Sequence, residues 1–423
     1  MDFPSDADWV FTYDSSAALN QKGKLASVGN GTVTTELEYT DRGEIAVERT
    51  LIVGSSYAVS YAYDAAGNLA SLQTPSGVAS EYAYSAGRPK TVTVTAGSSQ
   101  EVVRNLGFLP FGPRTRAEFP PYDSGAGANT VISTRSYNLR GQVAELEVTS
   151  PLGAVLDQSF EYGYMAGSPG PVDAGPNLDQ VVDHRDSSQS RFYLYDDLDR
   201  LWKSTTLSGT PLFTYTYDAN GNRAQQLAPG GTTDYTYQAS TDRIAQATGA
   251  AAKHYAHDVF GNRIWAGPTA YAGSPSHVYD QGNRLVEVRD PVTQAVLGQY
   301  AYDAAGRRVR KIAGGVTTLY FYDSAGHLLE SQNLSTSPAT RRSYVFVEDE
   351  PVGVVDQPPS GSPAFSWIHT DRLGTPLAVT NTPSSGSAKT IWRASYEPFG
   401  LATPDEDPDG DSQTFALDLR FPG

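Results

Sequence analysis

A short motif recurs along this chain and restricts its fold more than any other feature. Its clearest copy, YAYDAAGRR at residues 300–308, contains two tyrosines at i and i+2, then an aspartate and a glycine. In an extended strand the two tyrosines lie on one face, and the aspartate and glycine favour a tight turn. The motif therefore predicts a strand, a turn and a second strand, which together form a β-hairpin.

Further copies of the motif follow the same order, and one of them has His257 in place of the second tyrosine. The residues expected to build the repeats are Tyr61, Tyr63, Asp64, Gly67, Tyr215, Tyr217, Asp218, Gly221, Asp258, Gly261, Tyr279, Asp280, Gly282, Tyr300, Tyr302, Asp303, Gly306, Tyr320, Tyr322, Asp323 and Gly326. From position 195 to position 322 the second aromatic position recurs every 20–23 residues. A period in this range is typical of stacked structural repeats, so we predict an all-β chain of hairpins.

Composition limits the classes of partner. The formal net charge of −16 disfavours nucleic acid and anionic membranes, because both reward basic surfaces. The chain has no cysteine, and no apolar run reaches the ~18 residues of a membrane-spanning helix, so we expect no membrane insertion. The N-terminal residues lack the basic and apolar regions of a signal peptide.

The end of the chain carries a second pattern, HTDRLGTPLAVTN at 369–381, IWRASYEPFG at 391–400 and LDLRFPG at 417–423. With the preceding repeats, it resembles the RHS family of YD-repeat proteins and the start of the RHS repeat-associated core. The residues that carry the core resemblance are His369, Asp371, Gly374, Pro376, Trp392, Pro398, Phe399, Gly400, Arg420, Phe421, Pro422 and Gly423.

The resemblance implies a spiralling antiparallel β-sheet that closes into a hollow shell, as in bacterial Rhs effectors, the Tc toxin C component and animal teneurins. It also implies a non-enzymatic scaffold that encloses a C-terminal toxin or another polypeptide cargo, and that reaches the cell surface or the exterior through a larger parent protein or secretion machinery. The alternative is a cell-surface adhesion module that recognises glycans. The cleavage motif of the family is expected beyond Gly423, so we expect no autoproteolysis within this sequence.

We expect YD repeats over residues 1–345, and the last repeats with the start of the core over 346–423. Two segments rich in glycine and proline, 106–130 and 165–177, are expected to interrupt the repeats. The first should be an ordered loop packed on the strands through its aromatic residues. These residues are Phe108, Phe111, Phe119 and Tyr122.

Candidate chemistry is sparse. Metalloprotease, P-loop, nucleophile-elbow and dinucleotide-binding motifs do not occur, so we predict no enzyme and no cofactor. His369 and Asp371 could form an acid–base pair, but a structural turn is the favoured interpretation. The arginines of the second strands could form a row of anion sites, although ion pairs and aspartate-capped turns explain their spacing more simply.

An acidic loop near the C-terminus offers a possible metal site. Asp405, Asp407, Asp409 and Asp411 occupy positions 1, 3, 5 and 7 of a calcium-loop pattern, with glycine at position 6. Position 12 is Ala416 rather than glutamate, and the pattern has no flanking helices. A solvated acidic turn is therefore the favoured interpretation, and a calcium site is the alternative.

Overall fold

The computed structural model describes residues 8–120, 130–149, 155–164, 176–381 and 388–420 of the 423-residue chain. Its regular elements are strands and one short 3₁₀ helix, η1 (Ser187–Gln189). The strands form two long antiparallel sheets in which each strand pairs with the next along the sequence. The all-β fold predicted from the repeats is confirmed. Among the described residues, no helix is long and apolar enough to cross a membrane.

The first sheet, here called the first circuit, contains β1 (Val10–Tyr13), β2 (Leu25–Gly29), β3 (Val33–Tyr39), β4 (Ile45–Ile52), β5 (Ser55–Tyr63), β6 (Leu69–Gln73), β7 (Ala79–Ser85), β8 (Arg88–Ala96), β9 (Ser98–Phe108), β10 (Arg114–Phe119), β11 (Val131–Tyr137), β12 (Val143–Thr149), β13 (Val155–Tyr164), β14 (Leu178–Asp183), β15 (Arg191–Tyr195), β16 (Leu201–Thr205), β17 (Pro211–Tyr217), β18 (Arg223–Ala228), β19 (Gly231–Tyr237), β20 (Ile244–Gly249), β21 (Lys253–His257) and β22 (Arg263–Gly267). The second sheet, here called the second circuit, contains β23 (His277–Tyr279), β24 (Leu285–Arg289), β25 (Val296–Tyr302), β26 (Arg308–Ala313), β27 (Val316–Tyr322), β28 (Leu328–Asn333), β29 (Thr340–Val347), β30 (Glu350–Gln357), β31 (Ala364–Thr370), β32 (Pro376–Asn381), β33 (Thr390–Tyr396) and β34 (Ala402–Asp405).

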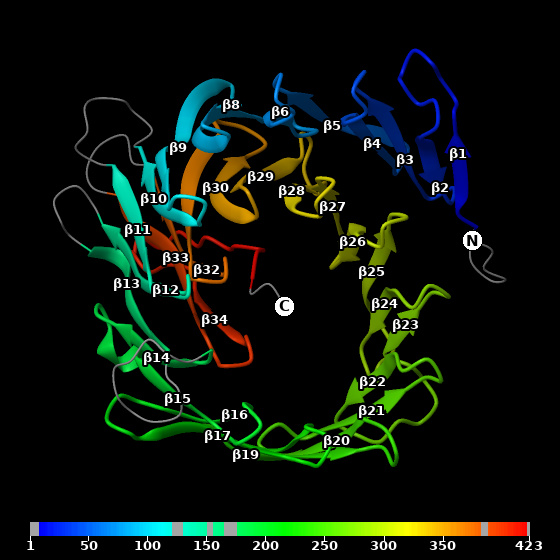
Figure 1. The fold of residues 1–423 in the computed structure, drawn as a ribbon. Coiled ribbons are helices and arrows are strands. Elements are labelled where there is room, and N and C mark those ends of the chain that lie inside the picture. The colour runs from blue at the N-terminus through cyan, green and yellow to red at the C-terminus, as the bar shows by residue number, and fades with distance from the viewer. Residues whose placement is uncertain (1–7, 121–129, 150–154, 165–175, 382–387, 421–423) are drawn as a thin grey trace.

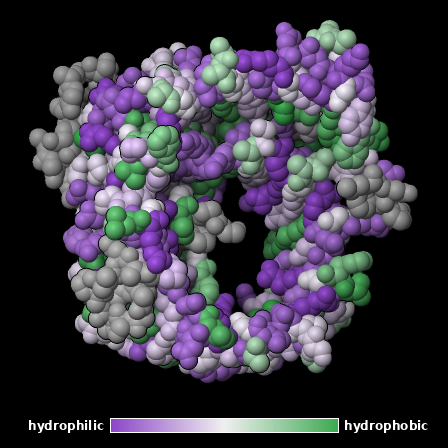
Figure 2. All heavy atoms as spheres, viewed as in Figure 1, coloured by the Kyte–Doolittle hydropathy of each residue, from purple (hydrophilic) through white to green (hydrophobic). Residues whose placement is uncertain are grey.

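The two sheets form one spiral around a central space (Figure 1). The backbone of Ser276 joins them, because its N–H donates to Ile264 O at 2.9 Å and its carbonyl accepts from Arg289 N at 2.8 Å. The spiral completes its first circuit near β1, where the guanidinium of Arg284 lies 5.6 Å from the ring centroid of Trp9. A space-filling view shows an opening in the middle of this face (Figure 2).

Most repeats place a β-bulge at the second aromatic residue. Tyr217 pairs with Arg223 and Tyr302 with Arg308, and in both cases the register shifts by one residue immediately before the tyrosine. A bulge bends its strand and increases the local right-handed twist. Because the bulge recurs with the repeat, it favours the continuous curvature of the sheet.

Strands β23–β25 continue the wall of the ring, and from β26 onward the second circuit lies on the inner side of the first, with the main cores between them (Figure 1). One core joins β3–β6 to β26–β28 and includes Val59, Tyr61, Leu319 and Phe321. Another joins β8–β13 to β29–β31 and includes Phe119 and Trp367. Together these cores attach the second circuit to the first over much of its length.

Strands β29–β32 are buried on both faces. Val345 and Val355 belong to the core shared with the first circuit, whereas Tyr344, Val354 and Ile368 belong to a third core on the opposite face. Leu417 and Phe415 of the C-terminal segment cover that face. Apolar residues on consecutive positions of β30 and β31 reflect this double burial.

Within the described part of the expected irregular segment at 106–130, residues 106–120 are more regular than predicted. β9 continues to Phe108 and β10 begins at Arg114, so residues 109–113 form an ordinary hairpin turn, with Leu109 N bonded to Pro113 O at 3.0 Å. Pro110 and Pro113 fall in this turn, where the sheet requires no N–H donor. Phe119 is buried in the core as expected, but Phe111 is fully exposed and packs on nothing.

The remaining expectations on organisation concern segment boundaries. Tyr122 and most of the 165–177 segment lie outside the described residues. The expected boundary near residue 345 falls within β29 and remains a prediction.

Candidate functional site: the inner wall of the spiral

Each repeat turn is built around its aspartate. In the turn after β17, Asp218 Oδ1 accepts from the backbone N–H groups of Asn220 and Asn222, each at 2.9 Å. The side-chain amide of Asn222 donates to Asp218 Oδ2 at 3.1 Å. Asp64 and Asp258 form the same contacts with Asn68 and Asn262. The side-chain amide of Asn222, with the backbone donors, holds the pKa of Asp218 below its ordinary value.

The motif glycines supply the left-handed backbone of these turns. Their φ angles lie between 80° and 96° at Gly67, Gly221, Gly261, Gly306 and Gly326. Gly282 does not fill this role, which corrects the sequence alignment of that repeat. The turn after Asp280 places Asn283 three residues after the aspartate, with φ 60°, because asparagine tolerates this conformation.

The second tyrosines form a ladder along the sheet. Each hydroxyl donates to a main-chain carbonyl of the preceding repeat, as Tyr302 does to Leu285 O at 2.6 Å and Tyr237 to Arg223 O at 2.8 Å. The acceptor is the residue that pairs with the second aromatic of that preceding repeat. The tyrosines of the ladder are Tyr39, Tyr63, Tyr84, Tyr137, Tyr195, Tyr217, Tyr237, Tyr279, Tyr302, Tyr322 and Tyr396.

The ladder explains why the second position is a tyrosine rather than any other aromatic residue. Burial raises the pKa of Tyr195, Tyr322 and Tyr396 to about 12, so their hydroxyls remain protonated donors at neutral pH. His257 occupies this position in its own repeat, and its Nδ1 is buried without a hydrogen-bond partner in the described structure. Sequence reasoning found these residues but did not find the bond that they make.

The tyrosine face of the sheet points inward. In the first circuit, the ring of Tyr57 lies 4.9 Å from that of Phe321, and Tyr82 Oη donates to Phe346 O at 3.2 Å. Both phenylalanines belong to the second circuit. Phe321 lies between Tyr320 and Tyr322 in β27, so these tyrosines occupy the opposite face, toward the central space.

The arginines of the repeats have two kinds of partner. Arg200, Arg284 and Arg307 pair with the aspartate of their own turn, with N–O distances of 2.6–2.7 Å. Arg223 and Arg308 instead lie against two tyrosines of successive repeats. The guanidinium of Arg308 is 5.5 Å from the Tyr300 ring and 5.0 Å from the Tyr320 ring, within the range of cation–π contacts.

The core signature forms two further turns of the repeat type. Asp371 Oδ1 accepts from the N–H groups of Leu373 and Thr375, and Gly374 has φ 83°. Glu397 replaces the aspartate in the next turn, which contains Pro398 and Phe399 and ends with Gly400 at φ 84°. Pro376 O accepts the ladder bond of Tyr396 at 2.9 Å. The hairpin geometry therefore continues through a segment that the sequence presents as different in kind.

His369 lies between the circuits rather than at a surface. Its Nε2 is 2.9 Å from Thr380 Oγ1, and its ring makes an edge contact with Phe119. Burial, with a smaller contribution from Arg114, lowers its pKa to about 3. Burial also raises the pKa of Asp371. His369 is therefore a neutral residue of the core at physiological pH.

A buried cluster of charges connects the circuits next to His369. Glu350 of β30 accepts from Arg114 Nη2 at 2.8 Å and from Arg135 Nη1 and Nη2 at 3.0 and 2.5 Å. Thr370 also donates to it. Burial alone would raise the pKa of Glu350, but the two guanidiniums outweigh burial and hold it below its ordinary value. The sequence does not reveal this cluster, because Glu350 lies 236 and 215 residues from its two arginines.

The C-terminal segment is held on the inner face of the second circuit. Leu417 is fully buried beside Trp392, and Arg420 lies 5.5 Å from the Trp392 ring. Arg342 donates to Ala416 O, and its guanidinium lies 4.5 Å from the Phe415 ring. Phe421, Pro422 and Gly423 lie outside the described residues. The inner wall thus binds a stretch of polypeptide that forms no assigned strand.

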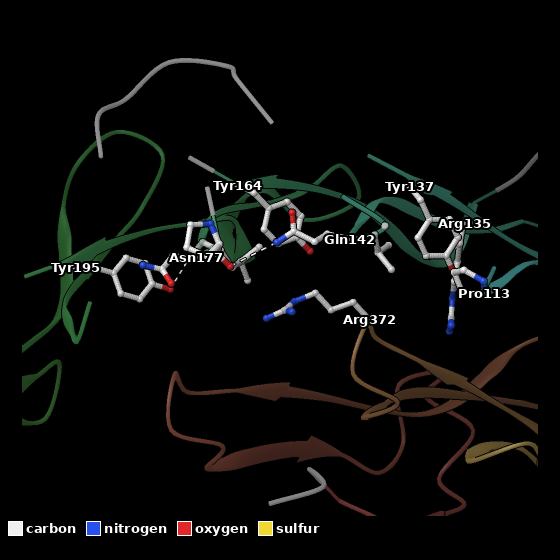
Figure 3. Close-up of a pocket in the computed structure, with 12 residues that line it drawn as sticks. Pro113, Arg135, Tyr137, Gln142, Tyr164, Asn177, Tyr195 and Arg372 are labelled. Carbon is white, nitrogen blue, oxygen red and sulfur yellow. Dashed lines mark hydrogen bonds between the residues drawn. The ribbon is translucent and has the colours of Figure 1, made fainter. Parts of the chain in front are cut away.

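A cavity of about 530 Å³ opens between the circuits (Figure 3). Tyr137, Tyr164 and Tyr195 line its wall, and Arg372 reaches toward them from the turn after β31. The amide side chain of Gln142 also lines the cavity. Burial raises the pKa of Tyr164, against the opposing effect of Arg372. Aromatic faces beside polar donors are typical of a ligand site.

The acidic loop follows β34. Asp405 does not join the other carboxylates, because it pairs with Arg393 of the neighbouring strand at 2.9 Å. Asp407, Asp409 and Asp411 each bring a carboxylate oxygen within 4.8 Å of the others.

An antiparallel hairpin spiral whose tyrosine face lines its interior defines a shell-type repeat protein. The Teneurin YD-shell family matches residues 124–416, and the RHS Repeat family matches residues 63–99. The chain therefore belongs to the Teneurin YD-shell family, within the wider group of RHS and YD-repeat proteins. This assignment confirms the resemblance found in the sequence.

Two curated relatives are bacterial nucleases. The tRNA3(Ser)-specific nuclease WapA of Bacillus spizizenii is 26% identical over 212 residues, which is 50% of this chain and 8% of that protein. The tRNA nuclease WapA of Bacillus subtilis (strain 168) is 29% identical over 129 residues, 30% of this chain and 5% of that protein. The chain thus corresponds to a small part of each.

Solved structures share the fold. The crystal structure of TcdB2-TccC3-Cdc42 superposes with a TM-score of 0.72 at 15% identity, covering 97% of this chain and 23% of that chain. The Photorhabdus luminescens Tc holotoxin pore superposes with a TM-score of 0.72 at 17% identity, covering 94% and 22%. At these identities the likeness establishes the architecture of the shell.

Proposed function

We propose that this chain forms part of the wall of a non-enzymatic shell that encloses a polypeptide, either a C-terminal toxin or another cargo. The observation that carries the proposal is the binding of residues 413–420 on the inner face. That segment has no strand assignment, yet the wall binds it through an apolar site for Leu417 and through Arg342. An interior with such sites can hold an extended passenger without requiring it to fold.

The wall offers further sites of the same kind. The inward face repeats tyrosines at regular intervals, and Arg308 lies between the rings of Tyr300 and Tyr320. Such contacts do not depend on a particular passenger sequence. The net charge of −16 adds an attraction for cationic cargo that salt should weaken.

The proposal extends to partners and location. The relatives named above are nucleases, and TccC3 is found together with TcdB2 and Cdc42 in one of the solved complexes. We infer that the chain acts within a larger toxin protein, at the cell surface or outside the cell, and that it depends on delivery machinery. No nucleic acid or cofactor is part of this proposal.

Protease protection of a passenger tests the proposal. A flexible reporter peptide would be fused after Gly423 in the wild type, in Leu417→Asp and in Leu401→Asp, and digested under native conditions. Leu417 is buried on the inner face, whereas Leu401 is exposed in the last hairpin turn and provides the matched control.

We expect the reporter to survive in the wild type and the control, and to be cut faster in Leu417→Asp, which releases the docked segment. Circular dichroism would establish that all three proteins remain folded. Rapid cleavage of the reporter in the folded wild type would refute enclosure, and equal cleavage in the wild type and Leu417→Asp would refute docking through Leu417. If the retention of a cationic reporter did not change with salt concentration, only the proposed electrostatic attraction for the cargo would be refuted.

The cavity in Figure 3 supports carbohydrate recognition as a second candidate function. The partly exposed rings of Tyr137 and Tyr195 are available for stacking, and Gln142 and Arg372 carry hydrogen-bond donors. A glycan array would test it: binding lost in Arg372→Ala would support recognition at this cavity, and no binding by the wild type would reject it.

A further inference from the structure

The acidic loop after β34 has an unusual balance of charge. Residues 405–411 contain five carboxylates. Arg393 neutralises Asp405, with Nη2 at 2.9 Å and Nε at 3.1 Å from its carboxylate. The nearest cation to the remaining aspartates is Lys389, whose ammonium lies 3.7 Å from Asp409 Oδ2, beyond hydrogen-bonding distance.

Three of these carboxylates converge. Asp407, Asp409 and Asp411 each place one oxygen within 4.8 Å of the other two. Two oxygens that bind the same Ca²⁺ at about 2.4 Å each can be up to about 4.8 Å apart, so the observed spread suits a single ion. Backbone N–H groups of Asp411 and Ser412 orient Asp407, at 3.1 and 3.2 Å.

Asp409 supplies an independent observation. Its side chain is only 9% exposed, and its Oδ2 is buried without a hydrogen-bond donor in the described structure. This oxygen has lost water and faces only the Lys389 ammonium at 3.7 Å, without a hydrogen bond, which is costly for a buried carboxylate. A bound cation would supply that missing partner, whereas a solvated acidic turn would leave the oxygen in water.

We propose that Asp407, Asp409 and Asp411 bind one Ca²⁺. The donors are all hard oxygens, and the irregular loop, with Pro408 and Gly410, suits the flexible coordination of Ca²⁺ better than the strict octahedron of Mg²⁺. Three side chains do not fill six or more positions, so backbone carbonyls or water complete the shell. Asp405 is excluded from the site by Arg393.

The position of the loop gives the ion a consequence. Phe415 N donates to Glu406 O at 2.8 Å, so the loop closes directly onto the segment that docks through Phe415 and Leu417. Ca²⁺ would fix the start of this segment, and its removal would loosen the docking. The metal proposal rests on the loop alone and does not depend on enclosure of a cargo.

Calorimetric titration of the full chain with CaCl₂, after treatment with chelator, tests the proposal. The variants are Asp409→Asn, which removes one ligand, and Asp405→Asn, which removes an equal charge two residues before the first ligand. Melting temperature with Ca²⁺ and with chelator provides a second readout, and circular dichroism confirms folding.

We expect one site with a dissociation constant of about 10⁻⁴–10⁻³ M, the range of sites with few charged ligands. Asp409→Asn should weaken binding at least about tenfold, and Asp405→Asn should change it less than about threefold, as expected when one of three carboxylate ligands is lost. Ca²⁺ should raise the melting temperature of the wild type and of Asp405→Asn only. No binding at millimolar Ca²⁺, or equal weakening by both substitutions, would overturn the proposal.

Discussion

Replacing Glu350 by glutamine tests how the two circuits of the spiral are held together. Glu350 is the single carboxylate between Arg114 and Arg135 in this cluster, and the three side chains are 19%, 8% and 10% exposed. Glutamine has nearly the same shape but carries no charge, and it accepts through one oxygen instead of two. The substitution therefore leaves two buried guanidiniums without a counter-charge.

The expected loss of unfolding free energy follows from the burial of these three side chains. Removing one partner of a buried ion pair typically costs about 3–5 kcal/mol. The three donor–acceptor contacts of 2.5–3.0 Å between Glu350 and the arginines are all affected. We therefore expect Glu350→Gln to lower the free energy of unfolding by at least about 3 kcal/mol, the lower end of that range, because glutamine retains one acceptor.

Urea denaturation followed by tryptophan fluorescence is the assay. Trp367 lies in the core between the circuits and donates to Val102 O at 3.0 Å, so its emission reports separation of the circuits. Asp405→Asn is the control, because its pair with Arg393 has side chains that are 42% and 47% exposed. Loss of such an exposed pair should cost less than about 1 kcal/mol.

The same carboxylate predicts a pH dependence. The folded-state pKa of Glu350 lies below its ordinary value, so its contribution is present above the ordinary pKa of about 4.3 and is lost as the pH falls through the folded value. Glu350→Gln should therefore lose less stability than the wild type on acidification below about pH 4. If Glu350→Gln were no more destabilising than Asp405→Asn, the inference that the Glu350 cluster holds the two circuits together would be refuted.

Two further predictions concern the ladder and a histidine turn. Tyr302→Phe removes the bond to Leu285 O and should cost about 0.5–1.5 kcal/mol of unfolding free energy, whereas His257→Tyr restores a missing rung and should add a similar amount. Urea melts measure both, and stabilisation by His254→Tyr in the same strand would count against the ladder as the cause. His327 Nδ1 donates to Asp323 Oδ2 at 2.8 Å, and Nε2 lies 3.3 Å from Asp349. The bond with Asp323 raises the pKa of His327. A raised folded-state pKa gives stability that is complete below about pH 6.5 and lost as the pH rises through the folded value, so melting temperature should fall over that window in the wild type and stay flatter in His327→Asn.

The local part of this structure could be predicted from the sequence. Alternating tyrosines, an aspartate and a glycine specify a hairpin within about ten residues, so the fold class and the turns follow from the motif. Even Gly282 misleads only by one position, because Asn283 can adopt the backbone that glycine adopts elsewhere. The prolines near residue 110 were misleading for a similar reason, since they occupy a turn of the same size as the others.

The relation between the circuits could not be predicted. Alternation places Tyr320 and Phe321 on opposite faces but does not say which face is inside. Glu350 meets Arg114 across 236 residues, and no local pattern reports such a contact. One signal was available: β30 and β31 contain runs of consecutive apolar residues, which indicate strands buried on both faces.

The tyrosine ladder and the Glu350 cluster constrain the evolution of the chain differently. Each ladder bond joins only neighbouring repeats, so duplication or loss of one whole unit of 20–23 residues leaves every other rung intact. The contacts of Glu350 with Arg114 and Arg135 instead require a fixed number of repeats between these residues. A unit gained between Arg135 and Glu350 would carry Glu350 past its arginines, whereas a unit gained outside the stretch from Arg114 to Glu350 would leave these contacts in place. Gain or loss of whole units should therefore be rarer between Arg135 and Glu350 than elsewhere in the spiral.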